Sequence, residues 1–299
     1  MGAGAQASVE GHGRDVALCA LAYGVAAVVA LAVGYAVSDA HPIVVVAAAD
    51  LVATLVVFAF STAFGNSSFY DAYWSVAPVA IAIYWAAAQA DRGVDIVRQL
   101  LVVLLVIWWA VRLTYNWVRR WEGLGHEDWR YVDFRQQYGS LYWLIDLFGL
   151  HLFPTAMVFL GCLSLYPALA SGTRPLGAVD ILAAAVTAAA ISIETIADQQ
   201  LWRFLNGSRK PGEILATGLW AYSRHPNYFG EILFWWGLFL FGLAADPSYW
   251  WTIIGPVAMV LMFVFASVPM IDRRSVERRP GYAVHMTKVS AIVPWFPQR

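Results

Sequence analysis

A dense run of polar residues extends from Glu194 to Glu231, between two apolar stretches of the chain. Glu194 and Asp198 are spaced i, i+4, which places both carboxylates on one face of an expected helix. Two helix-breaking pairs follow, Asn-Gly and Pro-Gly, and the run ends in Arg-His-Pro-Asn-Tyr-Phe-Gly-Glu. Donors, acceptors and aromatic rings beside a helix N-terminus favour an anionic ligand such as a phosphate or a carboxylate.

The same run carries two adjacent basic residues, Arg209 and Lys210. An arginine binds phosphate through a bidentate fork and a lysine binds it as a point charge. Basic residues in a cytoplasmic loop also satisfy the positive-inside rule without binding anything. Both interpretations stay open at this point.

A second polar turn, Gly-Asn-Ser-Ser-Phe-Tyr-Asp-Ala-Tyr-Trp-Ser, covers residues 65–75. The side chains of Tyr70 and Asp71 can hydrogen-bond a substrate carbonyl or hydroxyl group. Asn, Ser and Asp are also the usual helix-capping residues. A substrate site and a simple capping turn are equally consistent with this pattern.

Other charged residues have simpler interpretations. His126, Glu127 and Asp128 are consecutive, so on a helix they point in different directions, and we expect a charge-paired loop and no metal. Asp50 lies in the middle of an apolar run, where a carboxylate costs ~2.5–3.5 kcal/mol on the insertion scale. Such a residue usually faces the bundle interior or a wet cavity, and Asp50 is either a protonated or hydrogen-bonded packing residue or a functional carboxylate.

The elements that must position these groups are membrane helices. Of the 299 residues, 60% are hydrophobic and only 13% are charged, whereas a soluble domain has about 25% charged residues. The net charge of -1 gives no reason to expect a nucleic-acid partner. Cys19 and Cys162 lie inside apolar runs, so we expect them to be small buried residues.

Eight apolar stretches are close to the ~20 residues that a helix needs to cross a bilayer. They cover residues 15–37, 43–64, 73–90, 94–113, 141–169, 177–202, 228–245 and 250–271. The sequence therefore predicts an all-α, polytopic transmembrane helix bundle of about eight spans, with seven or nine as alternatives. We expect one integral membrane domain over residues 1–299, whose motif-rich, cofactor-binding half is about 190–299.

The basic residues predict the orientation of the bundle. With the N-terminus inside, 16 of the 19 basic residues fall on the cytoplasmic side, and only Arg92, Arg98 and Arg174 fall outside or near the outer margin. Both termini and the polar, motif-rich face are thus predicted to be cytoplasmic. The alanine-rich helices favour a bacterial plasma membrane, and the first apolar run is too long for a typical cleavable signal.

The motifs of the polar run resemble a known family. They are Ser223–Glu231, the preceding Gly-Leu-Trp, and Arg-Lys-Pro-Gly-Glu at 209–213. Together they are similar to the steroid 5-alpha-reductase C-terminal-domain family, and most similar to its bacterial branch, the DUF1295 membrane proteins. The Gly-His-Glu-Asp-Trp-Arg-Tyr loop and the Asn-Ser-Ser-Phe-Tyr-Asp turn resemble that branch too. The resemblance covers roughly residues 50–297.

The resemblance implies a helical membrane reductase that passes a hydride from NADPH to an activated carbon–carbon double bond of a lipid. It places Asp198, Arg209, Asn227, Tyr228 and Glu231 on cofactor-contact or motif positions, and Arg274 on a further one. Glu194 stands where the mammalian reductases have an asparagine. The full set of expected cofactor-binding residues is Glu194, Asp198, Arg203, Arg209, Lys210, Tyr222, Arg224, His225, Asn227, Tyr228, Glu231 and Arg274.

The family's catalytic pair is a glutamate and a tyrosine near the second to fourth helices, which polarise a keto group. Aligning Arg112 with the family arginine puts Trp109 where the tyrosine would be. Tyr70 with Asp71, or Tyr115, are the substitutes that we expect.

We therefore expect NADPH to bind from the cytoplasm and a hydrophobic, lipid-like substrate to enter from the bilayer, among membrane lipids. One alternative is an S-adenosylmethionine-dependent methyltransferase of the isoprenylcysteine or phospholipid type, because those enzymes share Arg-His-Pro-x-Tyr. Another is a lipid-binding scaffold without catalytic activity.

Overall fold

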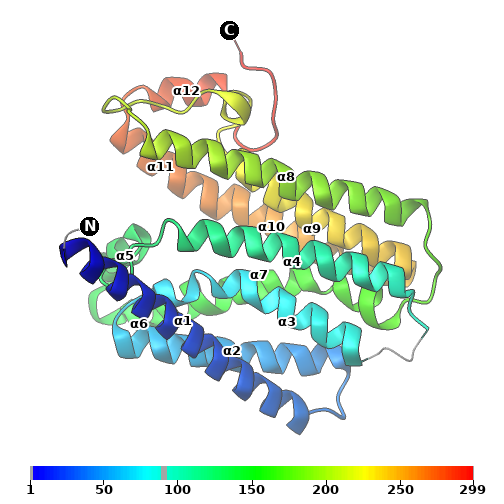
Figure 1. Ribbon diagram of the computed structural model, residues 1–299. Helices are drawn as coiled ribbons and strands as arrows, with labels where there is room; N and C mark the ends of the chain where they lie inside the picture. Colours follow the sequence, from blue (N-terminus) through cyan, green and yellow to red (C-terminus); the bar gives the residue numbers. More distant parts are fainter. Residues whose placement is uncertain (1–2, 89–92, 299) are drawn as a thin grey trace. The chain divides into compact units, whose positions relative to one another are not determined.

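The computed structural model describes residues 3–88 and 93–298, and every regular element in these ranges is helical (Figure 1). Within them, seven helices are long and apolar enough to cross a membrane. They are His12–Ala36, Pro42–Phe64, Ile96–Val118, Trp129–Cys162, Ala178–Asn206, Pro226–Ala245 and Pro247–Arg278. The predicted all-α, polytopic class is confirmed, whereas the orientation of the termini stays a prediction.

The predicted third span forms a shorter helix. It is α3 (Tyr73–Ala88), which has 16 residues and contains Pro78. At 1.5 Å per residue, 16 residues fall short of ~30 Å of hydrocarbon. The other seven predicted stretches each correspond to one of the long helices.

The chain divides into two compact units. Unit 1 comprises Met1–Ala87 and Trp109–Phe159, and unit 2 comprises Ala88–Trp108 and Leu160–Arg299. The predicted cofactor-binding half, about 190–299, falls entirely within unit 2. The substitutes for the catalytic pair, Tyr70, Asp71 and Tyr115, fall in unit 1.

Unit 1 begins with α1 (Ala3–Ala36), which crosses α2 (Pro42–Phe64) (Figure 1). Gly65, at φ 63°, ends α2 in the left-handed conformation. The short helix η1 (Ser67–Tyr70) and α3 follow and complete a core with α1 and α2. The core residues are Cys19, Ala22, Ala26, Ala53, Val57, Phe69, Tyr70, Tyr73 and Ala77.

The second part of unit 1 starts within α4 (Ile96–Val118) and continues through short helices. These are α5 (Trp129–Tyr138), η2 (Gly139–Leu141), α6 (Tyr142–Leu144), the π-helical η3 (Ile145–Leu152) and α7 (Phe153–Cys162). Asp128 begins α5 by accepting a hydrogen bond from Arg130 N through its side chain.

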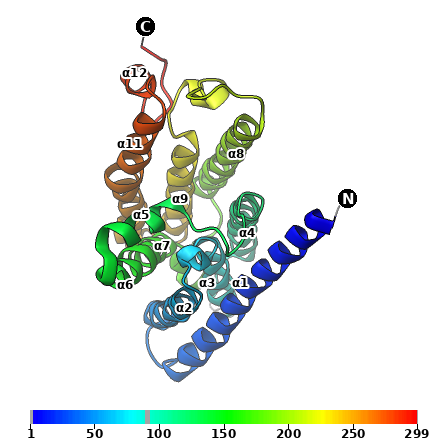
Figure 2. The same ribbon diagram turned by 90° about the vertical axis from the view of Figure 1, so that its left-hand side faces the viewer.

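Unit 2 is built around the antiparallel pair α8 (Ala178–Asn206) and α9 (Pro226–Ala245), which lie side by side in Figures 1 and 2. Its remaining elements are η4 (Pro167–Ser171), η5 (Gly218–Ala221), η6 (Pro247–Ile253), α10 (Ile254–Met262), η7 (Phe263–Ser267), α11 (Val268–Arg278) and α12 (Tyr282–Lys288).

Glycines bring α8 and α9 together. A Cβ at Gly230 would overlap Glu194 Cγ and lie 2.9 Å from the Ala190 carbonyl oxygen, and a Cβ at Gly237 would lie 3.1 Å from Thr187 Cα. In a membrane, lipid tails are as apolar as the helix surfaces, so close packing at small residues drives helix association. The two glycines therefore fix the spacing at which α8 and α9 present their polar groups.

Candidate functional site

The polar groups of α8 and α9 meet at the ends of the two helices that are predicted to face the cytoplasm. Asp198 is 7% exposed, and Asn227 Nδ2 lies 3.4 Å from Asp198 Oδ1. Glu194, one turn before Asp198, is buried against Gly230. Glu231 is also buried and accepts a hydrogen bond of 2.9 Å from Trp235 Nε1. The i, i+4 spacing thus does bring Glu194 and Asp198 onto the face that α9 covers.

The loop between α8 and α9 folds back onto the end of α8. Leu219 N donates to Gln200 Oε1 at 3.0 Å, and Trp220 Nε1 donates to the Ala197 carbonyl at 3.1 Å. Gly218 has φ +61°, and a Cβ there would lie 2.6 Å from Gln200 Cδ, so only glycine fits this turn. Tyr222, which follows η5, is 43% exposed.

Asp272 on α11 is the centre of a buried hydrogen-bond cluster. Its Oδ2 accepts from Arg224 Nη2 at 2.7 Å, and its Oδ1 lies 3.0 Å from both His225 Nε2 and the Tyr282 hydroxyl. Burial, followed by the charge of Asp272, raises the pKa of Tyr282 well above its usual range. Sequence reasoning missed Asp272, although it is an acidic residue placed between an apolar run and two arginines.

Arg224 and His225 thus hold the C-terminal segment in place. Arg224 Nη1 donates to the carbonyls of Met286 and Val289, at 3.1 and 2.8 Å. The His225 ring stacks on the Tyr228 ring, with centroids 5.3 Å apart and an interplanar angle of 10°. The structure shows these contacts within the chain, and a role of Arg224, His225 or Tyr228 in cofactor binding stays a prediction.

A cationic mouth, defined by Arg209, Arg278 and Arg279, forms where the loop after α8 meets the end of α11. At Gly212 an added Cβ would lie 4.0 Å from Pro280 Cδ, so the two segments lie close together. Burial lowers the pKa of Arg279, and the positive charges of Arg209 and Arg278 lower it further.

The mouth contains residues that sequence reasoning singled out and others that it did not. Arg209 and the adjacent Lys210 are exposed, as is Arg203 in the last turn of α8. Arg274 is partly buried on α11. In the sequence, Arg278 and Arg279 counted only toward the asymmetric distribution of charge along the chain. Their proximity to Arg209 depends on how the loop after α8 folds.

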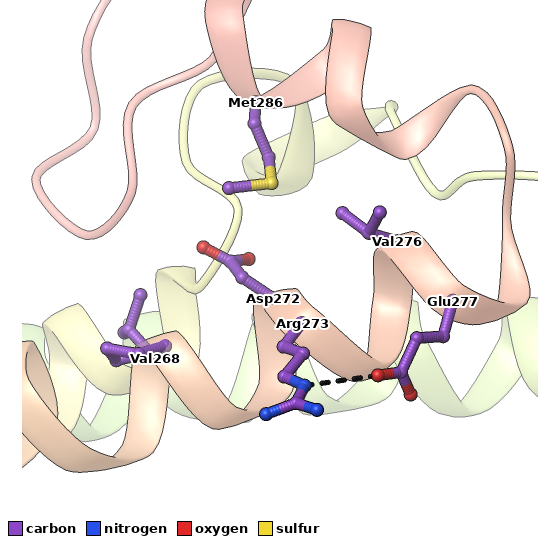
Figure 3. Close-up of a pocket in the computed structure, with 7 residues that line it drawn as sticks. Val268, Asp272, Arg273, Val276, Glu277 and Met286 are labelled. Atoms are coloured by element: carbon purple, nitrogen blue, oxygen red, sulfur yellow. Dashed lines mark hydrogen bonds and ion pairs between the residues drawn. The ribbon is translucent and has the colours of Figure 1, made fainter.

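An open groove lies beside Asp272 (Figure 3). Its volume is about 630 Å³, and its lining residues are Val268, Pro269, Asp272, Arg273, Val276, Glu277 and Met286. Arg273 Nε lies 3.2 Å from Glu277 Oε1 on its rim. The groove therefore combines an apolar wall with the buried carboxylate that holds Arg224.

In unit 1, the predicted substitutes for the catalytic pair are held by different partners. The Tyr70 hydroxyl is 2.8 Å from Thr155 Oγ1. Asp71 accepts a hydrogen bond from the Tyr131 hydroxyl. Burial raises the pKa of Asp71 to about 6, although the charge of Arg130 and the Tyr131 hydrogen bond oppose the shift.

The third substitute, Tyr115, is 63% exposed on α4. The guanidinium of Arg119 lies 5.5 Å from the centre of its ring.

Unit 1 also contains an acid–tyrosine pair that the sequence did not reveal. The Tyr73 hydroxyl donates to Asp50 Oδ1 at 2.8 Å, between α3 and α2. Asp50 is 7% exposed, so the expectation of a hydrogen-bonded interior carboxylate is confirmed. The only sequence signal for this pair was that the charged residue lies in the middle of a span.

The two polar loops of unit 1 bind one another. Asn66 caps η1 by accepting from Ser68 N, and its Nδ2 donates to the carbonyls of Leu124 and His126. Arg135 Nη2 pairs with Glu127 Oε1 at 2.9 Å. The capping that the sequence allowed for this turn is present, the expected charge-paired loop is confirmed, and a substrate role of the turn stays a prediction. In the described part of the chain, no three His, Cys, Asp or Glu side chains form a cluster that could hold a metal ion.

Residues 57–289 match the family described as "Protein of unknown function (DUF1295)". The chain belongs to the DUF1295 family. It is 30% identical over 251 residues to an uncharacterized protein of Schizosaccharomyces pombe, a match that covers 77% of this chain and 73% of that protein. No solved structure matches the chain. The predicted family is thus confirmed at the level of DUF1295, for which no activity is described.

Proposed function

We propose that this DUF1295 protein is an NADPH-dependent reductase that acts on a carbon–carbon double bond of a lipid, steroid-like or isoprenoid substrate. The observation that carries the proposal is the cationic mouth of unit 2. The loop that contributes Arg209 to this mouth connects α8, which contains Asp198, to α9, which contains Asn227. Like charges repel, so three arginines gather at one mouth most favourably when an anion of several charges binds there.

The proposed phosphate-binding groups are Arg209, Arg278 and Arg279, with Lys210 beside them. A guanidinium fork matches two phosphate oxygens, and a dinucleotide that carries a 2′-phosphate offers more anionic charge than one that lacks it. We propose Arg203 and Arg274 as further cationic contacts from the last turn of α8 and from α11.

The proposed ribose and carboxamide contacts are Asp198 and Asn227. A carboxylate accepts hydrogen bonds from hydroxyl groups, and an asparagine amide both donates and accepts. The two side chains lie 3.4 Å apart, so a single ligand group could contact both of them. When bound, the nicotinamide supplies the hydride, and the protein supplies binding and orientation.

The proposed hydrogen-bond donor to the polar end of the substrate is a tyrosine. Its single hydroxyl proton goes to a carboxylate in the ligand-free protein, and it would have to turn to a substrate carbonyl to stabilise the charge that develops on the oxygen. We assign this role to Tyr73, held by Asp50, because the pair occurs between α2 and α3. The Tyr70 hydroxyl and the Asp71 carboxylate, which are also hydrogen-bonded within unit 1, are the alternatives.

The overall reaction adds one hydride and one proton across the double bond. The cofactor would supply the hydride to the double bond, and Tyr73 would pass its proton to the carbonyl oxygen. The resulting enol would tautomerise to the saturated ketone, and Tyr73 would recover a proton before the next turnover.

Titration of the purified full-length protein with NADPH, by quenching of tryptophan fluorescence or by calorimetry, tests the proposal. Replacing Arg209 and Arg279 together by Ala is expected to weaken binding by at least about tenfold, the effect of losing two charge-assisted phosphate contacts. The matched control is Arg273→Ala, because Arg273 is an exposed arginine on α11 whose partner is Glu277.

Three results would contradict the reductase. One is absence of NADPH binding at millimolar cofactor by a folded protein. Another is equal weakening by Arg273→Ala and by the double variant. The third is saturable binding of S-adenosylmethionine and not of NADPH, which would favour the methyltransferase.

A further inference from the structure

Hydrogen-bonding side chains line one face of α2 in the interior of unit 1. Asp50, Thr54 and Ser61 are spaced by four and by seven residues, so they share a face of the helix, and all three are buried. Polar groups are costly inside a membrane protein and usually mark a pathway or a site. The partners of these three residues come from α3, α7 and η3.

The inner end of this series is Asp50. Its Oδ1 accepts from Tyr73, whereas Oδ2 is buried without a hydrogen-bond partner among the described residues. Tyr70, Tyr73 and Thr155 are among the residues packed around it, and they leave no space for a water molecule. An unpaired carboxylate charge costs several kcal/mol away from water, and a proton on Oδ2 removes that charge.

The middle of the series consists of hydroxyl groups. Thr155 Oγ1 lies 2.9 Å from Thr54 Oγ1 and 2.8 Å from the Tyr70 hydroxyl. The Tyr70 ring packs on the His151 ring, with centroids 4.9 Å apart. Hydroxyl groups donate and accept in the same position, so a proton that enters at one oxygen can leave from another.

His151 connects the hydroxyls to a second buried carboxylate. Its Nε2 lies 3.0 Å from Ser61 Oγ, and its Nδ1 lies 2.9 Å from the Asp146 carbonyl and 3.1 Å from Asp146 Oδ1. The ring is fully buried. Both residues belong to the π-helical segment η3, and π-helical turns occur frequently at functional sites.

The outer end reaches an exposed loop. Tyr142 is one helical turn before Asp146, and its hydroxyl lies 2.7 Å from Ser67 Oγ. Ser67 N donates to Glu127 Oε1, and the Glu127 carboxylate pairs with Arg135, whose side chain is 42% exposed. The series therefore runs from the surface to the membrane interior within one unit.

We propose that this series, the unit 1 relay, conducts protons from the exposed loop at Glu127 to Asp50. Its members in order are Glu127, Ser67, Tyr142, Asp146, His151, Tyr70, Thr155, Thr54, Tyr73 and Asp50, and Ser61 hydrogen-bonds His151 beside this path. His151 is the central member, because an imidazole can take a proton on one nitrogen and release one from the other.

Three steps of the unit 1 relay lack a hydrogen bond between side chains. Glu127 accepts from the backbone N–H of Ser67 and not from its hydroxyl, and neither Tyr142 and Asp146 nor His151 and the Tyr70 hydroxyl are hydrogen-bonded. At a fourth step, His151 Nδ1 lies 3.1 Å from Asp146 Oδ1 without a hydrogen bond. The proposal requires rotation of the Glu127, Tyr142, Asp146 and His151 side chains to close these steps. The use of the relay in turnover rests on the proposed function, in which Tyr73 must regain the proton that it loses. The proton path itself is independent of the reaction.

Infrared spectroscopy of the purified full-length protein in lipid tests the relay without any substrate. A carbonyl band of a protonated carboxylic acid is assigned to Asp50 by its loss in Asp50→Asn. Transfer into D₂O then shifts that band at the rate at which protons reach Asp50. Replacing His151 by Gln retains a hydrogen-bonding side chain but removes the titratable ring, and is expected to slow the exchange at least about tenfold.

Ser61→Ala is expected to slow the exchange as well, with a milder effect on folding. Ser192→Ala is the control, because that hydroxyl bonds only the Ala188 carbonyl of its own helix in unit 2. Absence of an Asp50-dependent acid band, or equal exchange in the wild type, His151→Gln and Ser61→Ala, would overturn the proposal. Titration of the same variants with NADPH tests the proposed function independently of the proton path.

Discussion

Arg98 holds Asp180 through two parallel hydrogen bonds, from Nε to Oδ1 at 2.7 Å and from Nη2 to Oδ2 at 3.0 Å. Both side chains are fully or almost fully buried. The same guanidinium donates to the Arg174 carbonyl through Nη1 at 2.8 Å. Asp180 also accepts from Gly177 N, so one ion pair joins the start of α4, the loop before α8 and the first turn of α8.

We predict that Arg98→Ala destabilises the protein by about 3–5 kcal/mol, because it leaves the Asp180 carboxylate buried and unpaired. Thermal unfolding in a mild detergent measures the loss. Replacing both residues together, as Arg98→Met with Asp180→Leu, is expected to cost less than Arg98→Ala alone. If the double variant were less stable than Arg98→Ala, the cost of the single substitution would not come from leaving Asp180 unpaired.

Asp272→Asn provides the second prediction. The amide keeps the size of the side chain but loses the charge that three donors share, so Arg224, His225 and Tyr282 lose their common acceptor. We expect faster hydrogen–deuterium exchange over residues 279–298, which Arg224 joins to the loop after α8. Glu277→Gln, which changes an exposed carboxylate on the same helix, should leave this exchange unaltered. Equal exchange in both variants would contradict the assignment.

The sequence predicted features that depend on local chemistry. Apolar run length located the helices, and the i, i+4 spacing of Glu194 and Asp198 placed them on one face, which α9 covers. Asn66 and Asp128 were recognisable as members of capping or charged turns, and both do cap helices. These features follow from the period of the helix and from side-chain chemistry within a few residues.

Features that depend on contacts between distant segments were not predictable. The role of Asp272 as the common acceptor of a hydrogen-bond cluster depends on the packing of α11 beside the residues that follow η5. The pairing of Asp50 with Tyr73 depends on the turn at Gly65 and on the start of α3. His151 and Ser61 are 90 residues apart. A single sequence carries no information on which of several buried polar residues will share a hydrogen bond.

Asp71 provides a prediction on pH. Burial raises its pKa from 3.8 to about 6, so the folded protein binds more protons than the unfolded chain between these values. Stability contributed by Asp71 is therefore complete below about pH 4 and is lost as the pH rises through about 6, with an expected loss of about 1–3 kcal/mol. Chemical unfolding at a series of pH values measures it, and Asp71→Asn should flatten this part of the profile. If the protein instead lost stability on acidification, and Asp71→Asn abolished that loss, folding would lower the pKa of Asp71, contrary to the prediction.

Gly237→Ala tests the packing that positions the candidate nucleotide site. The added methyl group would overlap Thr187 Oγ1 and lie 3.1 Å from the Thr187 backbone, so α8 and α9 must separate to admit it. Overpacking of this kind costs about 1–3 kcal/mol. Gly24→Ala is the matched control, because a Cβ at that helical glycine meets nothing within 4 Å, and alanine there is expected to be neutral or stabilising by up to about 1 kcal/mol. Thermal unfolding of the two variants under identical detergent conditions compares them. If Gly237→Ala were as stable as Gly24→Ala, the close approach of α8 and α9 would not be what holds Asp198 opposite Asn227.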